Sequence, residues 1–276
     1  MGITLIATAS GTDDASDTTL NCSSSLNVAL GDLLVAYYNS SNKSATHTIA
    51  DTAAGNAFTM LTAVNATQSY RMGFGYKLSA TANATSTFRL TLSQAGSNRR
   101  IGVYQFRPTA GGIVSLDGAQ NPAEGSGTTP QSGNISTIGT DEVVLAFSGM
   151  WDYATLSSPL IADAAATGSL AAGTYVSSWY KLFTATQTNI HAQGTLAGSD
   201  SDWLCNIVAF KSVTPATITA DGPQIEKTTQ IDPNIMRPRL IVPGLMLATA
   251  ILNAPAPTGV QDYFIPHVHK KMIFGL

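Results

Sequence analysis

Two stretches of this chain start with an acidic residue and continue as an apolar run: Asp32-Leu-Leu-Val-Ala-Tyr37 and Glu142-Val-Val-Leu-Ala-Phe147. Each is followed by a Tyr-Lys-Leu triplet, at residues 76–78 and 180–182. Each triplet is followed by another largely apolar run, Ile101-Gly-Val-Tyr-Gln-Phe106 or Cys205-Asn-Ile-Val-Ala-Phe210. Continuous apolar runs of this length are typical of strands buried on both faces.

The spacing of these runs indicates a duplication. The step from Tyr76 to Phe106 is 30 residues, and so is the step from Tyr180 to Phe210. We therefore predict a β-structured region over residues 1–213 that contains two related strand sets, at residues 30–107 and 140–211.

Shorter patterns add to this prediction. In residues 87–92, Phe88, Leu90 and Leu92 alternate with polar residues, as expected for a strand with one buried face. Residues 49–51 and 58–61 read as two strands joined by a turn, and residues 111–139 as a connection with a short strand near 113–116. Residues 162–172 are the best candidate for a turn of helix, although Gly168 argues against a long one.

Composition supports an all-β fold. Charged residues make up 11% of the chain and hydrophobic residues 44%, with a net charge of −3. Abundant Ser, Thr and Gly suit strands and turns. We expect an antiparallel, jelly-roll-like two-sheet sandwich with internal duplication, in which each copy supplies one strand set; two small sandwiches are the alternative. The low content of Lys and Arg argues against nucleic-acid binding.

Residues 214–276 differ from the rest and are predicted to form an extended C-terminal arm. Eight prolines between Pro215 and Pro266 exclude long helices and central strands. Large apolar side chains are nevertheless frequent, which is unusual for a solvated linker. We expect the arm to contact neighbouring subunits through these anchors: Leu240, Ile241, Val242, Leu245, Leu247, Ile251, Leu252, Tyr263, Phe264 and Ile265.

No catalytic motif is evident. No Gly-x-Ser-x-Gly motif surrounds any serine, and glutamates are scarce. Acidic residues that could form a glycosidase pair lie mostly in turn-like contexts, which favours a structural role. These residues are Asp13, Asp14, Asp17, Asp117, Asp141, Glu142, Asp152, Asp163, Asp200 and Asp202. We predict no enzymatic activity and no cofactor.

Three patterns were considered as metal sites. Asp200-Ser-Asp202 and the cluster of Asp13, Asp14 and Asp17 could bind calcium through loop oxygens, but neither has an EF-hand pattern, and solvated turns are favoured. His267-Val-His269 would place two imidazoles on one face of an extended segment, and three such pairs could ligate an axial metal in a trimer. Two surface histidines are the favoured interpretation, so no metal is predicted.

Surface aromatic residues could stack on sugars. Trp179 and Trp203 lie in strand patterns and are expected in the core. Trp151 and Tyr153 follow the end of a strand and are the best candidates for an exposed pair that contacts glycan. Cys22 and Cys205 are expected to be unpaired thiols.

Targeting signals are not apparent. The N-terminus lacks a basic start and a long apolar stretch, so we expect no signal peptide. The longest apolar stretch, residues 240–252, is interrupted by Pro243 and Gly244 and is too short to span a membrane.

Four motifs carry a family resemblance: Gly31-Asp-Leu-Leu-Val, residues 51–59, Tyr76-Lys-Leu, and the closing Val-Ala-Phe-Lys211. They resemble β-sandwich modules of phage virion proteins and bacterial surface proteins, over residues 30–211. The resemblance implies a jelly-roll-like or lectin-like sandwich used for structure or adhesion, and no catalytic residues. We therefore expect a virion structural protein, a capsid decoration or auxiliary head protein held by its arm to other virion proteins or to copies of itself. A tail or fibre component, or an adhesin that binds host surface glycan, is the alternative.

Overall fold

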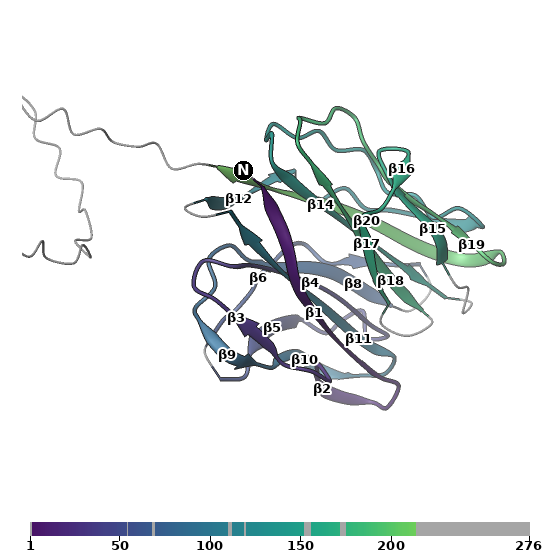
Figure 1. The fold of residues 1–276 in the computed structure, drawn as a ribbon. Coiled ribbons are helices and arrows are strands. Elements are labelled where there is room, and N and C mark those ends of the chain that lie inside the picture. Colours follow the sequence, from purple (N-terminus) through teal and green to yellow (C-terminus); the bar gives the residue numbers. More distant parts are fainter. Residues whose placement is uncertain are drawn as a thin grey trace, which may run out of the picture. The chain divides into compact units, whose positions relative to one another are not determined.

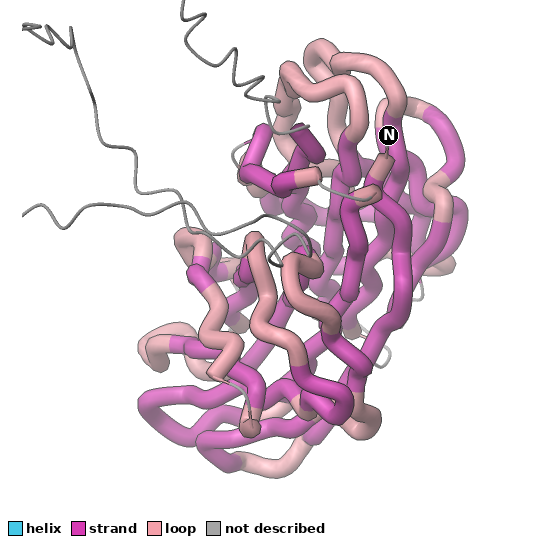
Figure 2. Tube along the Cα trace, turned by 60° about the vertical axis from the view of Figure 1, so that its left-hand side comes forward, coloured by secondary structure: helices cyan, strands magenta, loops and turns pink. Residues whose placement is uncertain are grey.

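The computed structural model describes residues 2–53, 55–67, 70–109, 112–118, 120–151, 156–171 and 175–213. These residues belong to one compact unit, Met1–Ile218. Within them regular structure is β-strand and the sheets are antiparallel, which confirms the all-β prediction (Figure 2). None of these residues forms a helix that could cross a membrane. The predicted arm, residues 214–276, lies outside the described residues.

The first copy, together with the strands that precede it in the chain, forms two main sheets. The larger one has the strand order β1-β11-β4-β8-β6, with β7 also paired to β8. Its strands are β1 (Ile3–Asp13), β4 (Leu33–Ser40), β6 (Thr59–Met60), β7 (Val64–Asn65), β8 (Arg71–Lys77) and β11 (Arg99–Pro108). The smaller sheet, in the order β2-β10-β5, contains β2 (Asp17–Asn21), β5 (His47–Asp51) and β10 (Phe88–Gly96). A short pair joins β3 (Leu26–Val28) to β9 (Asn83–Ser86).

The second copy repeats this plan. Its larger sheet has the order β12-β20-β14-β18-β17, with β13 also paired to β20. These strands are β12 (Ile113–Gly118), β13 (Ala123–Gly127), β14 (Glu142–Met150), β17 (Gly168–Ala171), β18 (Val176–Phe183) and β20 (Asp200–Val213). The smaller sheet contains β15 (Leu156–Ile161), β16 (Ala164–Ala165) and β19 (Ala192–Leu196). Figure 1 shows both copies.

Hydrogen-bond register shows the duplication directly. In the first large sheet Val35 lies opposite Tyr76 on one side and Tyr104 on the other. In the second, Leu145 lies opposite Tyr180 and Val208. Tyr76 and Tyr180 therefore occupy the same position in their sheets, as the equal spacing in the sequence predicts.

Both large sheets are buried on both faces. Because successive side chains of a strand point to opposite faces, each central strand contributes to two apolar clusters. In β4, Leu33, Val35 and Tyr37 belong to one apolar cluster, whereas Leu34 and Ala36 belong to another. The second cluster fills the space between the two sheets of the first copy. In β14 the same alternation separates residues 143, 145 and 147 from residues 144 and 146.

One apolar cluster joins the copies. It combines residues from both large sheets, among them Tyr37, Tyr104, Phe147, Tyr180 and Phe210. The large sheets thus pack against each other, as predicted for a sandwich with one strand set from each copy. Each large sheet also carries a smaller sheet on its other face, so each copy is a sandwich in its own right. Two small sandwiches were the alternative interpretation, and the strands predicted at residues 49–51 and 87–92 lie in the smaller sheet of the first copy.

The candidate helical turn at residues 162–172 is wrong. Ala162 and Asp163 have φ values of 54° and 56°, and they connect Ile161 to its partner Ala164. Two consecutive residues with positive φ form the two-residue turn that matches the twist of a β-hairpin. This segment therefore continues as β16 and β17, and the alanine-rich composition is a feature of an outer hairpin.

The strands give the double sandwich two distinct ends. At the arm end, β4 and β14 begin and β20 ends at Val213, where the predicted arm starts. At the loop end, β4 and β14 finish, and β8, β11, β18 and β20 begin. Tyr70 lies just before β8, and its hydroxyl donates to the Gly149 carbonyl in β14 at 3.2 Å. The loop ends of the two copies are therefore next to each other.

Candidate functional site

A cleft of about 270 Å³ lies at the loop end, between the two copies. It is lined by side chains at strand ends: Asn39, Ser41, Tyr70, Asn98, Met150, Trp151 and Tyr175. Residues of both copies contribute, so the cleft depends on the packing of one large sheet against the other.

Trp151 is the exposed ring of the cleft. Its side chain is 39% exposed, and its backbone N–H donates to Asp200 Oδ1 at 3.2 Å. The Tyr70 ring lies beside it, with 6.4 Å between the ring centroids and 12° between their planes. Tyr70 is buried, and its hydroxyl donates to the Asp202 carbonyl at 2.9 Å. The indole is therefore supported by a ring that is itself anchored in the second copy.

The Tyr175 ring of the second copy is contacted by an arginine of the first copy. The Arg100 guanidinium lies 5.4 Å from the centroid of its ring, a cation–π geometry. Arg100 is buried, and its Nη2 donates to Asp14 Oδ1 at 2.5 Å. The arginine is thus fixed by Asp14 on one side while it contacts the ring on the other.

Asn39 is the principal polar group of the cleft. It is 5% exposed, and its Oδ1 accepts no hydrogen bond from any group in the described part of the chain. Neighbouring polar groups are better satisfied: Ser41 Oγ and Ser97 Oγ are 2.8 Å apart, and the Ser97 N–H donates to Ser41 Oγ at 3.0 Å. Asn98, with φ of 49°, makes the tight turn between β10 and β11.

The lining is polar without being charged. Burial raises the pKa of Tyr70, and the nearby carboxylates of Asp202 and Asp200 raise it further, so this phenol stays neutral. The seven lining residues include no Asp, Glu, Lys or Arg. The cleft therefore offers aromatic rings, amides and hydroxyls to a ligand.

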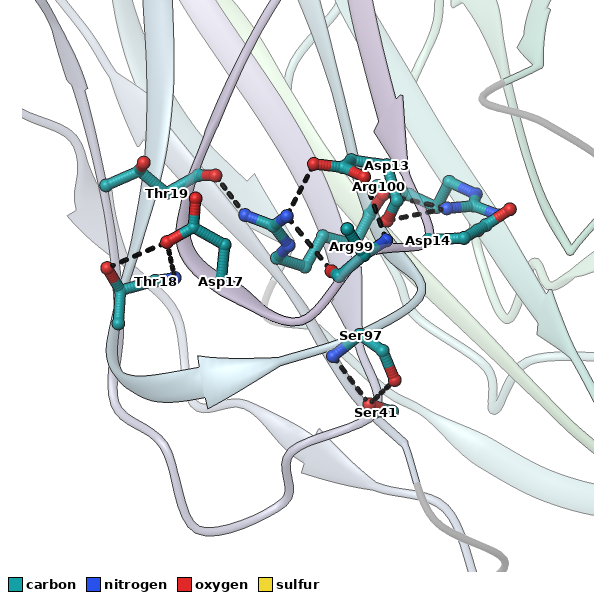
Figure 3. Close-up of polar contacts among 10 residues, drawn as sticks. Asp13, Asp14, Asp17, Thr18, Thr19, Ser41, Ser97, Arg99 and Arg100 are labelled. Atoms are coloured by element: carbon teal, nitrogen blue, oxygen red, sulfur yellow. Dashed lines mark hydrogen bonds and ion pairs between the residues drawn. The ribbon is translucent and has the colours of Figure 1, made fainter.

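A second, shallower hollow adjoins the first. Ser41 lines both, and the hollow of about 450 Å³ continues along Ser16, Asn42, Lys43, Ser44, Ala95, Gly96 and Ser97. Figure 3 shows Ser41 and Ser97 close to the loop that holds Asp13 and Asp14. The two hollows therefore meet at Ser41.

Asp13 and Asp14, considered for calcium, face arginines instead (Figure 3). Arg99 Nη2 lies 2.5 Å from Asp13 Oδ2, and Arg99 also donates to the carbonyls of Ala15 and Thr19. Asp17 Oδ1 accepts from the Thr18 N–H at 2.6 Å. These carboxylates therefore hold the loop between β1 and β2 in place.

Asp200 and Asp202, the other calcium candidate, lie beside the cleft. Asp200 Oδ1 accepts from the Asp202 N–H at 2.9 Å as well as from Trp151 N. This is a turn in which the carboxylate binds the backbone two residues on. Among the described residues, no group of three or more His, Cys, Asp or Glu side chains is arranged to hold a metal ion.

Asp117 and Glu142 form a carboxylate pair at the arm end. Glu142 is 1% exposed and the Asp117 side chain is fully buried. Burial raises the pKa of Glu142 to about 7, with a further contribution from Asp117. Burial alone would also raise the pKa of Asp117, but hydrogen bonds from Glu142, Lys211 and the backbone lower it to about 2. The pair therefore shares one proton near neutral pH, beside Lys211 Nζ at 2.8 Å.

The equivalent position in the first copy holds a simpler ion pair. Asp32 accepts from Arg107 Nε at 2.7 Å and from Gln105 Nε2 at 2.6 Å. Burial opposes ionisation of Asp32, but these bonds and one from the Ala29 N–H keep its pKa below the usual value. By register Asp32 corresponds to Glu142 and Arg107 to Lys211. In the second copy, however, Asp117 pairs with Lys211, whereas Glu142 accepts from Thr137 Oγ1.

Several other predicted residues can be placed. Trp179 and Trp203 are buried, which confirms their assignment to the core, and both cysteines are buried and unpaired. Asp163 Oδ1 lies 3.4 Å from His191 Nε2, and the Asp141 carbonyl accepts from Ser212 N. Outside the described residues lie Asp152, Tyr153, His267, His269 and the arm anchors Leu240, Ile241, Val242, Leu245, Leu247, Ile251, Leu252, Tyr263, Phe264 and Ile265.

Sequence reasoning found Trp151 but missed the rest of the cleft. Asn39, Tyr70, Asn98 and Tyr175 are far apart in the chain, and only the antiparallel register brings them together. Their common signal is that each lies at or next to the end of a strand. Comparison with protein-family models, with curated proteins and with solved structures finds no match for this chain.

Proposed function

We propose that this chain is a non-enzymatic structural protein of a bacteriophage virion, a capsid decoration or auxiliary head protein anchored through residues 214–276. In this assignment the double sandwich is the displayed body. The arm binds other virion proteins or further copies of the chain.

The observation that carries this proposal is the apolar character of the arm end. Large apolar side chains are strongly exposed at this end of the described structure: Leu30 at 79%, Ile113 at 57%, Ile138 at 76% and Val213 at 39%. Ile113 and Val213 are register partners on neighbouring strands. Exposed apolar groups at the end where an apolar arm begins support docking of this end against another protein surface.

The burial and hydrogen bonding of Asp117 and Glu142 support a non-enzymatic role. Asp117 and Glu142 are a titrating acid pair, the type of arrangement that glycosidases use. Both side chains are buried and bonded to Lys211 and Thr137, with 2.6 Å between Thr137 Oγ1 and Glu142 Oε2. Burial and these bonds support a structural role for both carboxyl groups.

Truncation after Val213 tests the proposal. The apolar clusters of the double sandwich contain residues up to Phe210, so the truncated chain should keep a β-type circular dichroism spectrum and a cooperative thermal transition. It should no longer enter phage particles, as measured by immunoblotting of particles purified from infected cells. Incorporation equal to that of the full chain would contradict the proposal, and an unfolded product would show that the arm completes the core.

A second variant separates the chemistry of the arm from its length. Changing Leu240, Leu245 and Leu252 to serine removes apolar groups from the full-length chain and should abolish incorporation. The matched control changes Thr228, Thr229 and Thr249 to serine and should incorporate normally. Equal incorporation of both variants would exclude apolar anchoring.

A tail or fibre component would use the same body and arm, and labelling of intact particles by immunoelectron microscopy distinguishes it from a head protein. A carbohydrate-binding adhesin is the remaining alternative. The observation that favours it is the uncharged aromatic cleft at the loop end, opposite the arm end.

A further inference from the structure

We infer that the loop-end cleft binds a neutral oligosaccharide, with one sugar ring on Trp151 and a sugar hydroxyl or amide N–H donating to Asn39 Oδ1. This inference concerns the double sandwich alone and does not depend on where the arm attaches.

The first argument is the unmatched acceptor of Asn39. A buried polar atom without a partner costs roughly 1–3 kcal/mol, and such atoms are uncommon in folded proteins. Asn39 Oδ1 finds no donor among the described residues, yet its residue lines an open cleft. A ligand that brings an O–H or N–H donor would satisfy it.

The second argument is the supported ring of Trp151. An exposed indole is unfavourable in water, but its flat face fits the C–H face of a pyranose, and its edge tolerates polar neighbours. Tyr70 packs beside Trp151 in a near-parallel plane and is bonded to two carbonyls of the second copy. The ring is therefore preorganised, which reduces the ordering that binding would require.

The third argument is charge. Phosphate and carboxylate ligands are bound by arginine or lysine side chains with accessible donors. Arg100, behind the Tyr175 ring, is buried and paired with Asp14, and none of the seven lining residues is charged. The cleft is accordingly matched to a neutral ligand rather than to a nucleotide or an acidic sugar.

The fourth argument is length. Ser41 also lines the second hollow, whose lining contains four serines besides Asn42 and Lys43. The Lys43 ammonium donates to the Thr67 carbonyl at 2.7 Å. The four serines are Ser16, Ser41, Ser44 and Ser97. Hydroxyl and amide groups can both donate hydrogen bonds to sugar hydroxyls and accept hydrogen bonds from them. Several sugar units would extend along both hollows, so affinity should rise from a monosaccharide to a trisaccharide of the same sugar.

The test uses the full-length chain and defined probes. A printed array that carries neutral oligosaccharides of hexoses, deoxyhexoses and N-acetylhexosamines, together with sialylated and sulfated glycans, identifies the preferred sugar. The best neutral trisaccharide is then titrated while tryptophan fluorescence is recorded. Trp179 is fully buried and Trp203 is 8% exposed, so a ligand-dependent change reports mainly on Trp151.

Variants give the decisive comparison. Trp151→Ala and Asn39→Leu should each weaken binding at least about tenfold, measured by calorimetry because the first variant lacks the fluorescent reporter. Asn39→Asp keeps an acceptor of the same size and should retain most of the affinity. Leu30→Ala, an exposed position at the arm end, is the matched control and should bind as the unaltered chain does. Thermal melting confirms that each variant is folded.

Three results would overturn the inference. The first is an array on which no neutral glycan binds, with no saturation transfer to millimolar trisaccharides by NMR. The second is binding restricted to sialylated or sulfated glycans. The third is neutral-glycan binding that Trp151→Ala leaves unchanged. If Asn39→Leu fails to fold, Trp151→Ala and Asn39→Asp still decide the outcome.

Discussion

The Tyr104 hydroxyl of the first copy lies 2.7 Å from the Ser178 hydroxyl of the second, inside the apolar cluster that joins the two large sheets. Ser178 Oγ donates onward to the Leu170 carbonyl at 2.9 Å, and the Tyr37 hydroxyl donates to the same carbonyl at 3.1 Å. Two tyrosines of the first copy thus reach one carbonyl of the second, directly or through a serine. This small polar network fixes the alignment of two otherwise apolar faces.

Removing the Tyr104 hydroxyl and removing the Ser178 hydroxyl should lower the free energy of unfolding by different amounts. Tyr104→Phe leaves Ser178 bonded to Leu170 and should lower the free energy of unfolding by about 1 kcal/mol. Ser178→Ala leaves the buried Tyr104 hydroxyl without this partner and should lower it by about 1–3 kcal/mol. Urea denaturation of both variants and of the double variant measures the coupling. Purely additive effects would show that the two hydroxyls do not interact.

The Glu142 carboxyl should make stability depend on pH. Its pKa is raised from 4.5 to about 7 in the fold, chiefly by burial. Between these values the folded chain holds a proton that the unfolded chain has released. Stability should therefore fall as pH rises through this window, by up to about 1.4 kcal/mol per pH unit. The opposite contribution of Asp117, whose pKa is lowered to about 2, is lost only in more acidic solution.

Glu142→Gln isolates this effect. A glutamine amide can donate to Asp117 as a protonated glutamate does, but it does not ionise. The variant should match the unaltered chain near pH 4.5 and exceed it in stability at pH 8, as measured by urea denaturation across the range. Glu124→Gln, at an exposed carboxyl whose pKa is lowered, is the control and should show no such trend. A stability difference that is constant with pH would contradict this account.

Gly102 should not tolerate a side chain. A Cβ at this position would overlap the ring of Tyr37, which lies opposite it in β4 and is 1% exposed. Gly102→Ala should therefore destabilise the chain by roughly 1–3 kcal/mol or more, because the ring has no room to move. At Gly198 a Cβ would meet no atom within 4 Å, so Gly198→Ala should be close to neutral. Thermal unfolding compares the two, and equal transition temperatures would refute the packing argument.

The two thiols should be unreactive in the folded chain. Burial raises the pKa of Cys22 to about 12 and raises that of Cys205 as well. Because the thiolate is the reactive form, Ellman's reagent should label neither residue at pH 8 and both in denaturant. Rapid labelling of one thiol without denaturant would contradict this prediction and would reveal local opening of the structure around that thiol.

Much of the sandwich core was predictable from local patterns. The run at residues 33–38 was predicted to be a strand buried on both faces, and β4 is buried along its whole length. The alternation of Phe88, Leu90 and Leu92 likewise corresponds to one buried face of β10. These signals are strong because a central strand must be apolar wherever it contacts a neighbouring layer.

The smaller sheet of the second copy and the cleft were not predictable in the same way. Strands β15 and β16 of that smaller sheet bury little, so their sequence carries serine and alanine instead of an apolar period. The cleft depends on which strand ends meet, and this follows from register and from the packing of the copies. Only Trp151 had a local signal, since it follows a strand end and is large and apolar.

The course of β20 from the loop end to the arm end has a mechanical consequence. This 14-residue strand runs from Asp200, beside Trp151, to Val213, where the arm begins, and it pairs with β14 over residues 142–150. A pulling force between a ligand on Trp151 and an anchored arm would load β14 and β20 parallel to their axes. Antiparallel ladder bonds lie perpendicular to the strands, so such a load is shared by the whole ladder in shear rather than breaking one bond at a time. With the proposed ligand and the proposed arm anchor both in place, the ladder between β14 and β20 would carry the load between the two ends of the double sandwich.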